Sequence, residues 1–243
     1  MTVRLRFADA GEAADLAAFL ARLIHYDRAA VVRVQAGGEV LGVFGRPPSF
    51  EVLAVRTARL AAPARLDATV SAGQLADALD AAVRGAEEPE AVLPPTVTGP
   101  PWAGVLPPRG GWERVEGLPD VDAMRGALAA AVAEFRTRDE ALPAQRRTRA
   151  ERDHIGREIW SRTLGATGLP LRAVHAAQAL GFLPATGARS ELPAPRRTGT
   201  TALAPEPPVL FRAAGWLRLR TTHGSVAVRT GGGLRDLTVT PTR

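Results

Sequence analysis

The 243-residue chain is 46% hydrophobic and carries 31 arginines against 25 acidic residues, a formal net charge of +6. This composition supports one large domain or two small ones with a packed core, and the lack of cysteine excludes disulfide bonds, thiolate metal sites and cysteine nucleophiles. No apolar run reaches about 18 residues and no signal-peptide segment follows the alternating residues 3–7, so we expect a cytoplasmic protein without a membrane span.

The first half predicts an antiparallel sheet with two helices packed on it, an α+β arrangement. Strands are expected over residues 3–7, 30–34, 39–44, 50–60 and 66–70. A tight turn is expected at Gly37-Gly38. Helices are expected over residues 11–24, capped by Asp9, and over residues 72–83, capped by Ser71.

The stretch 99–112 joins this half to the rest of the chain. It is rich in proline and glycine, which disfavour a regular helix, yet it carries large apolar side chains that need burial. Residues 87–119 are therefore predicted to form an ordered connector between two parts, 1–86 and 120–243. The residues expected to pack at this seam are Trp102, Arg109 and Trp112.

The second half predicts a helical bundle followed by a β-hairpin. Helices are expected over residues 123–136, 144–164 and 171–182. A long proline-rich loop over 184–208 precedes the hairpin region 209–239, whose last strand is expected over 234–239.

Positive charge is concentrated in the second half. Residues 1–98 hold 10 arginines and 12 acidic residues, whereas residues 99–243 hold 21 arginines and 13 acidic residues, so the net charges are −2 and +8. Such an asymmetry favours a polyanionic partner.

The predicted hairpin places Trp216 beside arginines on one face of its strands. Arginine contacts phosphate and an exposed indole can stack on a base, so this face suits DNA or RNA. The candidate nucleic-acid-binding residues are Arg146, Arg149, Arg172, Trp216, Arg218, Arg220 and Arg229.

The same region also allows plainer interpretations. Three pairs at i,i+4 spacing are typical of a solvated, salt-bridged helix: Arg147–Glu151, Asp153–Arg157 and Glu158–Arg162. His154 and Glu158 lie one helical turn apart but lack a third ligand, so no metal site, cofactor or catalytic residue is predicted. The element order also matches a winged helix, but the third helix offers only Arg172 and His175 for base contacts.

Four segments carry a resemblance to a known group of proteins: Leu106–Trp112, Ile159-Trp160, Leu171–Leu183 and Gly215–Leu219. Through them the chain resembles an uncharacterised family of GC-rich actinobacterial proteins, and this resemblance implies no activity. The run Leu66–Leu79 is similar to the strand and helix of a bacterial sliding-clamp repeat, and to the end of a sterol-carrier-type domain. These two fold-level likenesses concern residues 1–84.

We therefore predict a non-enzymatic binding or regulatory protein whose basic C-terminal half contacts nucleic acid. One alternative is a protein-interaction module or homo-oligomeric scaffold that uses exposed sheet edges and the segment 184–208. A third is a small-ligand carrier or an enzyme of unknown class, based on His154, Glu158 and a pocket near the tryptophans.

Overall fold

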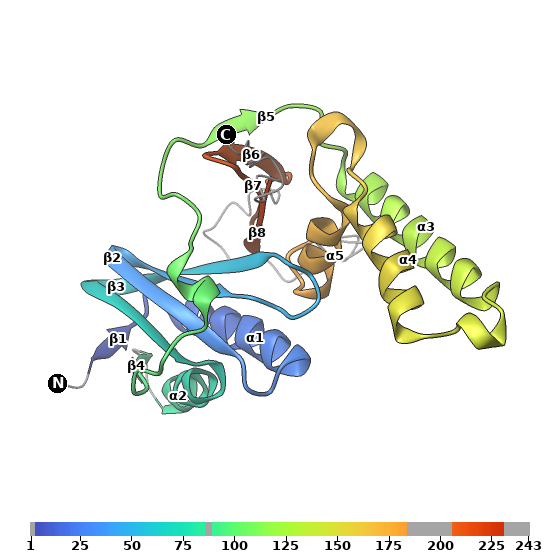
Figure 1. The fold of residues 1–243 in the computed structure, drawn as a ribbon. Helices are drawn as coiled ribbons and strands as arrows, with labels where there is room; N and C mark the ends of the chain where they lie inside the picture. Colours follow the sequence, from blue (N-terminus) through green and yellow to red (C-terminus); the bar gives the residue numbers. More distant parts are fainter. Residues whose placement is uncertain (1–2, 86–88, 184–205, 231–243) are drawn as a thin grey trace, which may run out of the picture.

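The computed structural model describes residues 3–85, 89–183 and 206–230. The fold is α+β, as predicted, and is built on a six-stranded antiparallel sheet with the order β2-β3-β8-β7-β6-β5 (Figure 1). These strands are β2 (Val31–Gly45), β3 (Leu53–Ser71), β5 (Glu113–Val115), β6 (Val209–Ala213), β7 (Trp216–Thr221) and β8 (Gly224–Arg229). Because β3 pairs with β8, a single sheet runs through both halves of the chain.

Two helices from the first half pack together against the β2–β3 part of this sheet, α1 (Ala10–Tyr26) and α2 (Ala72–Gly85). The predicted N-cap of α1 is confirmed, since the Asp9 side chain accepts a hydrogen bond from the Glu12 amide at 2.9 Å. Beside α2 lies a two-stranded antiparallel sheet of β1 (Arg4–Arg6) and β4 (Glu90–Val92).

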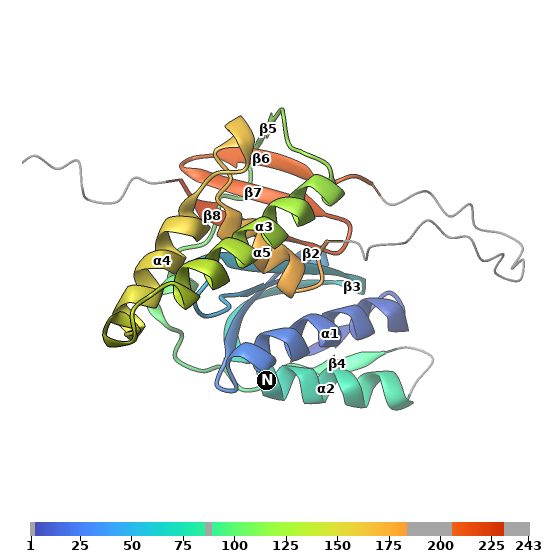
Figure 2. The same cartoon turned by 90° about the vertical axis from the view of Figure 1, so that its right-hand side faces the viewer.

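The helices of the second half are α3 (Val121–Glu140), α4 (Arg149–Ser161) and α5 (Leu171–Ala179). The first two form a helical hairpin that projects from the body of the protein, and α5 lies between this hairpin and β8 (Figures 1 and 2). Short 3₁₀ turns span Pro101–Gly104, Ala144–Arg146 and Gly165–Thr167. No helix in the described ranges is long and apolar enough to cross a membrane.

One apolar core fills the helix-covered side of the sheet, and it combines α1, α2, β2 and β3 with α5 and β6–β8. Phe182, just after α5, shows how the two halves meet in it. Its ring is 2% exposed and stacks on Phe19 of α1 with centroids 5.7 Å apart. It also packs against the β7–β8 turn, where a Cβ on Gly224 would come within 2.6 Å of the ring.

The opposite side of the sheet carries a smaller core. Leu53 of β3, Trp216 of β7 and Ala227 of β8 are buried there. The segment 99–112 covers them with Trp102, Leu106 and Trp112, and the Trp112 Nε1 donates to the Pro108 carbonyl at 2.9 Å. In the same segment, Arg109 donates to Gln35 Oε1 of β2 at 3.5 Å. The segment is thus ordered and lies over the junction of β3 and β8.

Two predicted breaks between strands are wrong. The predicted strands 30–34 and 39–44 form one strand, β2, and the predicted strands 50–60 and 66–70 form one strand, β3. Gly37-Gly38 does not turn the chain, because β2 continues through it and a bulge between Gly38 and Val40 absorbs the irregularity. The φ of +84° at Gly38 suits glycine. Opposite the bulge, residues 60–63 have no partner on β2. Pro63 therefore lies within β3 without removing a hydrogen bond from the β2–β3 ladder.

The predicted helix 144–164 is also wrong at its start. Thr148 caps α4, because its Oγ1 accepts a hydrogen bond from the Glu151 amide at 3.3 Å, so the helix begins at Arg149. The predicted strand 234–239 and most of the predicted loop 184–208 lie outside the described residues.

Candidate nucleic-acid interface

The candidate arginines beside and within α4 are ion-paired. Arg146 pairs with Glu151, and Arg149 pairs with Asp153 at 3.8 Å between Nε and Oδ2. Glu151 thus pairs with Arg146 in place of the predicted Arg147, because Arg146 precedes the helix and can fold back onto its first turn. Asp153 pairs with Arg149 in place of the predicted Arg157. The charges of these two candidate arginines are therefore compensated by neighbouring carboxylates.

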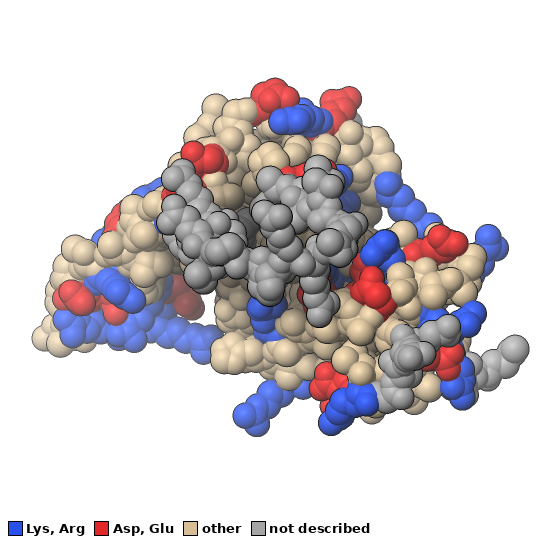
Figure 3. Space-filling view, turned by 180° about the vertical axis from the view of Figure 1, so that it is seen from behind, with Lys and Arg blue, Asp and Glu red and all other residues tan. Residues whose placement is uncertain are grey.

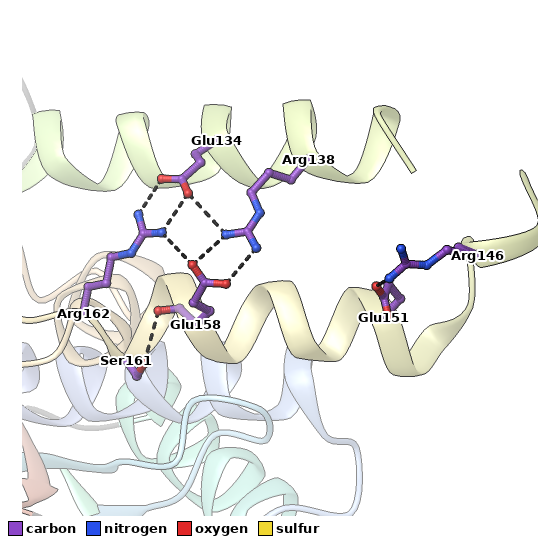
Figure 4. Close-up of polar contacts among 7 residues, drawn as sticks. All are labelled: Glu134, Arg138, Arg146, Glu151, Glu158, Ser161 and Arg162. Atoms are coloured by element: carbon purple, nitrogen blue, oxygen red, sulfur yellow. Dashed lines mark hydrogen bonds and ion pairs between the residues drawn. The ribbon is translucent and has the colours of Figure 1, made fainter. Parts of the chain in front are cut away.

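A ring of four charged side chains links α3 to α4 (Figure 4). Arg138 donates to both carboxylate oxygens of Glu158 at 2.9 and 2.7 Å. Arg162 donates to both oxygens of Glu134, at 2.5 and 2.8 Å, and to Glu158 at 3.2 Å, which confirms the predicted Glu158–Arg162 pair. Two forked guanidinium–carboxylate contacts fix the geometry of the helical hairpin.

The ring predicts a specific acid sensitivity. Hydrogen bonds from Arg138, then from Arg162, lower the pKa of Glu158 from 4.5 to about 2. A depressed carboxyl pKa stabilises the folded state above the unfolded pKa, and this contribution is lost as the pH falls toward the folded value. We expect the stability difference between the parent and Glu158→Gln to shrink from pH 4.5 to pH 2, measured by urea unfolding. Glu116→Gln serves as the control, because among the described residues Glu116 forms a single, exposed ion pair, with Arg114. A Glu158→Gln difference independent of pH would contradict the ring's role.

Neither histidine considered in the sequence lies in a ligand cluster. Glu158, the residue paired with His154 in the metal interpretation, already binds two arginines. Within the described residues there is no group of three or more His, Cys, Asp or Glu side chains that could hold a metal ion. His175 stacks on Trp160 with centroids 4.5 Å apart, and burial lowers the pKa of its imidazole.

The prediction of an exposed Trp216 is wrong. The indole is 7% exposed, because the segment 99–112 covers that face of β7. Arg229 of β8 lies over it, with Cζ 5.3 Å from the ring centroid. Trp216 therefore positions an arginine and does not present a free ring to a base.

Arg218 and Arg220 extend from the same strand face as Trp216, toward its other end. The Arg218 Cζ lies 5.8 Å from the Trp112 ring centroid, and its Nε donates to Ser225 Oγ at 2.9 Å. Burial and the neighbouring charge of Arg220 lower the pKa of Arg218. These two arginines line a cleft at the junction of β3 and β8. Arg229, the third candidate arginine of the hairpin, lines a different cleft.

Arg172 and Arg229 both line a cleft of about 520 Å³ at the start of β7 and the end of β8, which we call the arginine cleft. Arg212 of β6 joins them there. The described residues that line it include three arginines and no carboxylate: Ser161, Thr163, Gly168, Pro170, Arg172, Arg212, Leu217, Val228, Arg229 and Thr230.

The fold supplies each part of the arginine cleft from a different element. Buried Leu217 and Val228 form its apolar floor. Arg212 reaches over the turn before α5, with Nη2 3.9 Å from where a Cβ on Gly168 would lie. Arg172 comes from the first turn of α5, whose N-terminus adds partial positive charge.

Two of these arginines have no carboxylate partner in the described part of the chain, Arg212 and Arg229. Arg172 lies 3.7 Å from Glu51, measured from Nε to Oε2, and this Nε is buried without a hydrogen bond within the described ranges. The Arg229 guanidinium lies over Trp216, on the strand face opposite the floor of the cleft. Arg172 and Arg212 therefore supply the guanidinium donors that the cleft leaves free for an anion, with hydroxyl groups of Ser161 and Thr163 nearby.

Residues 107–233 match the family described as Domain of unknown function (DUF8185), and this match covers more than half of the chain. The chain belongs to the DUF8185 family. Residues 1–104 match a second family, Domain of unknown function (DUF8010). Nothing among curated proteins or solved structures matches the chain.

Every residue that lines the arginine cleft belongs to the DUF8185 region. The boundary between the two matched regions falls in the segment that covers the smaller core, whereas the β3–β8 pairing crosses from one region to the other.

Proposed function

We propose that this protein is a non-enzymatic binding protein whose DUF8185 region contacts nucleic acid through the arginine cleft. The observation that carries the proposal is that Arg172, Arg212 and Arg229 line one cleft whose described lining has no carboxylate. Guanidinium groups bind phosphate oxygens in forked geometry, and phosphate contacts supply nearly all of the affinity of sequence-independent nucleic-acid binding.

The charge pattern elsewhere supports this choice of site. Arg149 and Arg152 of α4, and Arg146 and Arg162 at its two ends, are each paired with an acidic residue. On the face seen from behind, basic and acidic side chains are interspersed over the visible surface (Figure 3). The arginine cleft differs from this surface, because no carboxylate is among its described lining residues.

The buried Trp216 shapes the kind of binding we propose. Its ring has one face toward Arg229 and is covered by the segment 99–112, so base stacking on it is not part of the proposal. Contacts to phosphate without contacts to bases fix position but carry no sequence information. We therefore propose binding that depends on salt and depends little on sequence.

The test compares the parent with the double variant Arg212→Gln/Arg229→Gln by fluorescence anisotropy, using labelled duplex DNA, single-stranded DNA and RNA. Each lost phosphate contact should reduce the slope of log K against log salt by about 0.9 for a duplex and about 0.7 for a single strand. We expect the double variant to lose about 1.8 of the duplex slope if both arginines contact phosphate.

The matched control is Arg114→Gln/Arg149→Gln, which removes the same charge from two exposed, ion-paired arginines. This control should keep the parent's slope of log K against log salt, apart from a small decrease that comes from the lower net charge. The proposal fails if the parent binds none of the three nucleic acids at about 50 mM salt, or if the control loses as much affinity as the cleft variant.

A further inference from the structure

A second cleft lies at the opposite end of the β7–β8 hairpin, and we call it the junction cleft. β3 pairs with β8 only over Leu53–Val55, and beyond this point β3 and the hairpin turn are not paired. The cleft there has a volume of about 480 Å³ and is lined by residues of both matched regions, among them Arg56, Arg218, Arg220 and Ser225.

Arg218 is the unusual residue of the junction cleft. Its guanidinium is partly buried, and within the described residues its neighbours are a hydroxyl, an aromatic ring and a second arginine. No carboxylate pairs with it in that part of the chain. A cation held away from water without a counter-charge is unfavourable, so the arrangement is one that a bound anion would stabilise.

The other groups around Arg218 favour a small anion. Arg220 and the hydroxyl groups of Thr221, Thr222 and Ser225 line the same cleft. Arg56 also lines it; its Nη2 pairs with Asp15, but its Nε is buried without an acceptor in the described ranges. These donors surround a space that suits several oxygen atoms on one centre.

The carboxylates of the junction cleft set the size limit. Glu12 is held by Arg59, with 2.7 Å between Arg59 Nε and Glu12 Oε1. Glu206 lies 3.6 Å from Arg220 and its side chain is 77% exposed, so this contact is weak. Negative charge at the rim disfavours a long polyanion, whereas a compact anion can displace Glu206 and reach Arg218.

We propose that the junction cleft binds a small oxyanion, inorganic phosphate or the terminal phosphate of a small molecule, between Arg218 and Arg220. This site is distinct from the arginine cleft and does not rest on nucleic-acid binding. Since both matched regions line it, a bound phosphate should also stabilise their junction by mass action.

The test titrates the full chain with inorganic phosphate at constant ionic strength, with chloride as the balancing ion. Saturable binding should change tryptophan fluorescence, because Arg218 lies over Trp112, and should raise the melting temperature. Arg218→Gln should weaken phosphate binding by at least about tenfold, the usual effect of losing a hydrogen bond to a charged group. Ser225→Ala, which removes only the hydroxyl that holds Arg218, should weaken it less.

Controls separate this site from the proposed function. Arg212→Gln, in the arginine cleft, should leave the phosphate-dependent change in Trp112 fluorescence unchanged, and Arg218→Gln should leave the salt slope for nucleic acid unchanged. Trp112→Phe should remove the fluorescence response but keep the thermal shift. The inference is overturned if the parent shows no saturable response to phosphate, or if Arg218→Gln and Ser225→Ala both respond as the parent does.

A nucleoside monophosphate and glycerol phosphate form the second arm of the same titration. Competition by these compounds at lower concentration than inorganic phosphate would identify a terminal phosphate as the ligand. Equal competition would identify the free anion.

Discussion

Replacing Phe182 with alanine is expected to lower the free energy of unfolding by about 3–5 kcal/mol. The ring is 2% exposed and stacks on Phe19, so the change leaves a cavity between α1 and the end of α5. It also removes the surface against which the turn at Gly224 packs. Urea unfolding followed by circular dichroism should show a lower midpoint with an unchanged slope.

Phe211→Ala is the matched control for this prediction, because Phe211 lies on β6 and is only partly buried. Phe211→Ala should lower the free energy of unfolding by clearly less than Phe182→Ala does. Phe182→Leu, which keeps most of the apolar volume, should also be milder. A loss below about 1 kcal/mol for Phe182→Ala would show that the contact between α1 and the hairpin does not depend on this ring.

Replacing Trp216 with alanine is the second large effect, again about 3–5 kcal/mol. The indole is 7% exposed at the centre of the smaller core, against Leu53 and Ala227 and beneath the segment 99–112. Its loss should loosen that segment as well as destabilise the sheet. Limited digestion with trypsin should then cleave more rapidly after Arg109, and urea unfolding should report the loss of stability.

Trp160→Ala provides the comparison for Trp216→Ala. Trp160 stacks on His175 beside α5 and has no part in the smaller core. It should reduce stability without increasing cleavage after Arg109 under conditions in which the protein remains folded. Unchanged cleavage in Trp216→Ala would mean that the segment is held by contacts other than this indole.

Local signals were enough to predict much of the fold. Asp9 identifies the start of α1, and alternating residues identify the strands of the hairpin region. Gly37-Gly38 was misleading because two glycines suit a tight turn and a bulge equally well. The length of the partner strand decides between them, since β3 continues far enough to pair with both arms of β2.

The pairing of β3 with β8 could not be predicted from local pattern. Residues 53–55 and 225–227 each look like buried strands, but nothing in either segment specifies the other as its partner. The same limit explains Trp216, because its burial depends on a segment about a hundred residues earlier in the chain.

The candidate site was predicted in part for similar reasons. Charge asymmetry and the hairpin pattern identified Arg172 and Arg229, and both line the arginine cleft. Arg212 was missed because its place depends on the register that sets it opposite Leu217. Ion-pair partners also could not be chosen from sequence spacing alone. Glu151 pairs with Arg146 and not with the predicted Arg147.

The shared sheet has a consequence for how the two matched regions can be used or inherited. A fragment ending at residue 104 would keep β3 but lose β8, and the complementary fragment would lose β3, so each would carry an uncovered strand edge. Such edges promote aggregation and pairing with foreign strands. We therefore expect the two regions to occur together in the same chain, and each region to aggregate when it is produced alone. Co-expressed fragments should be able to reassemble through this same edge.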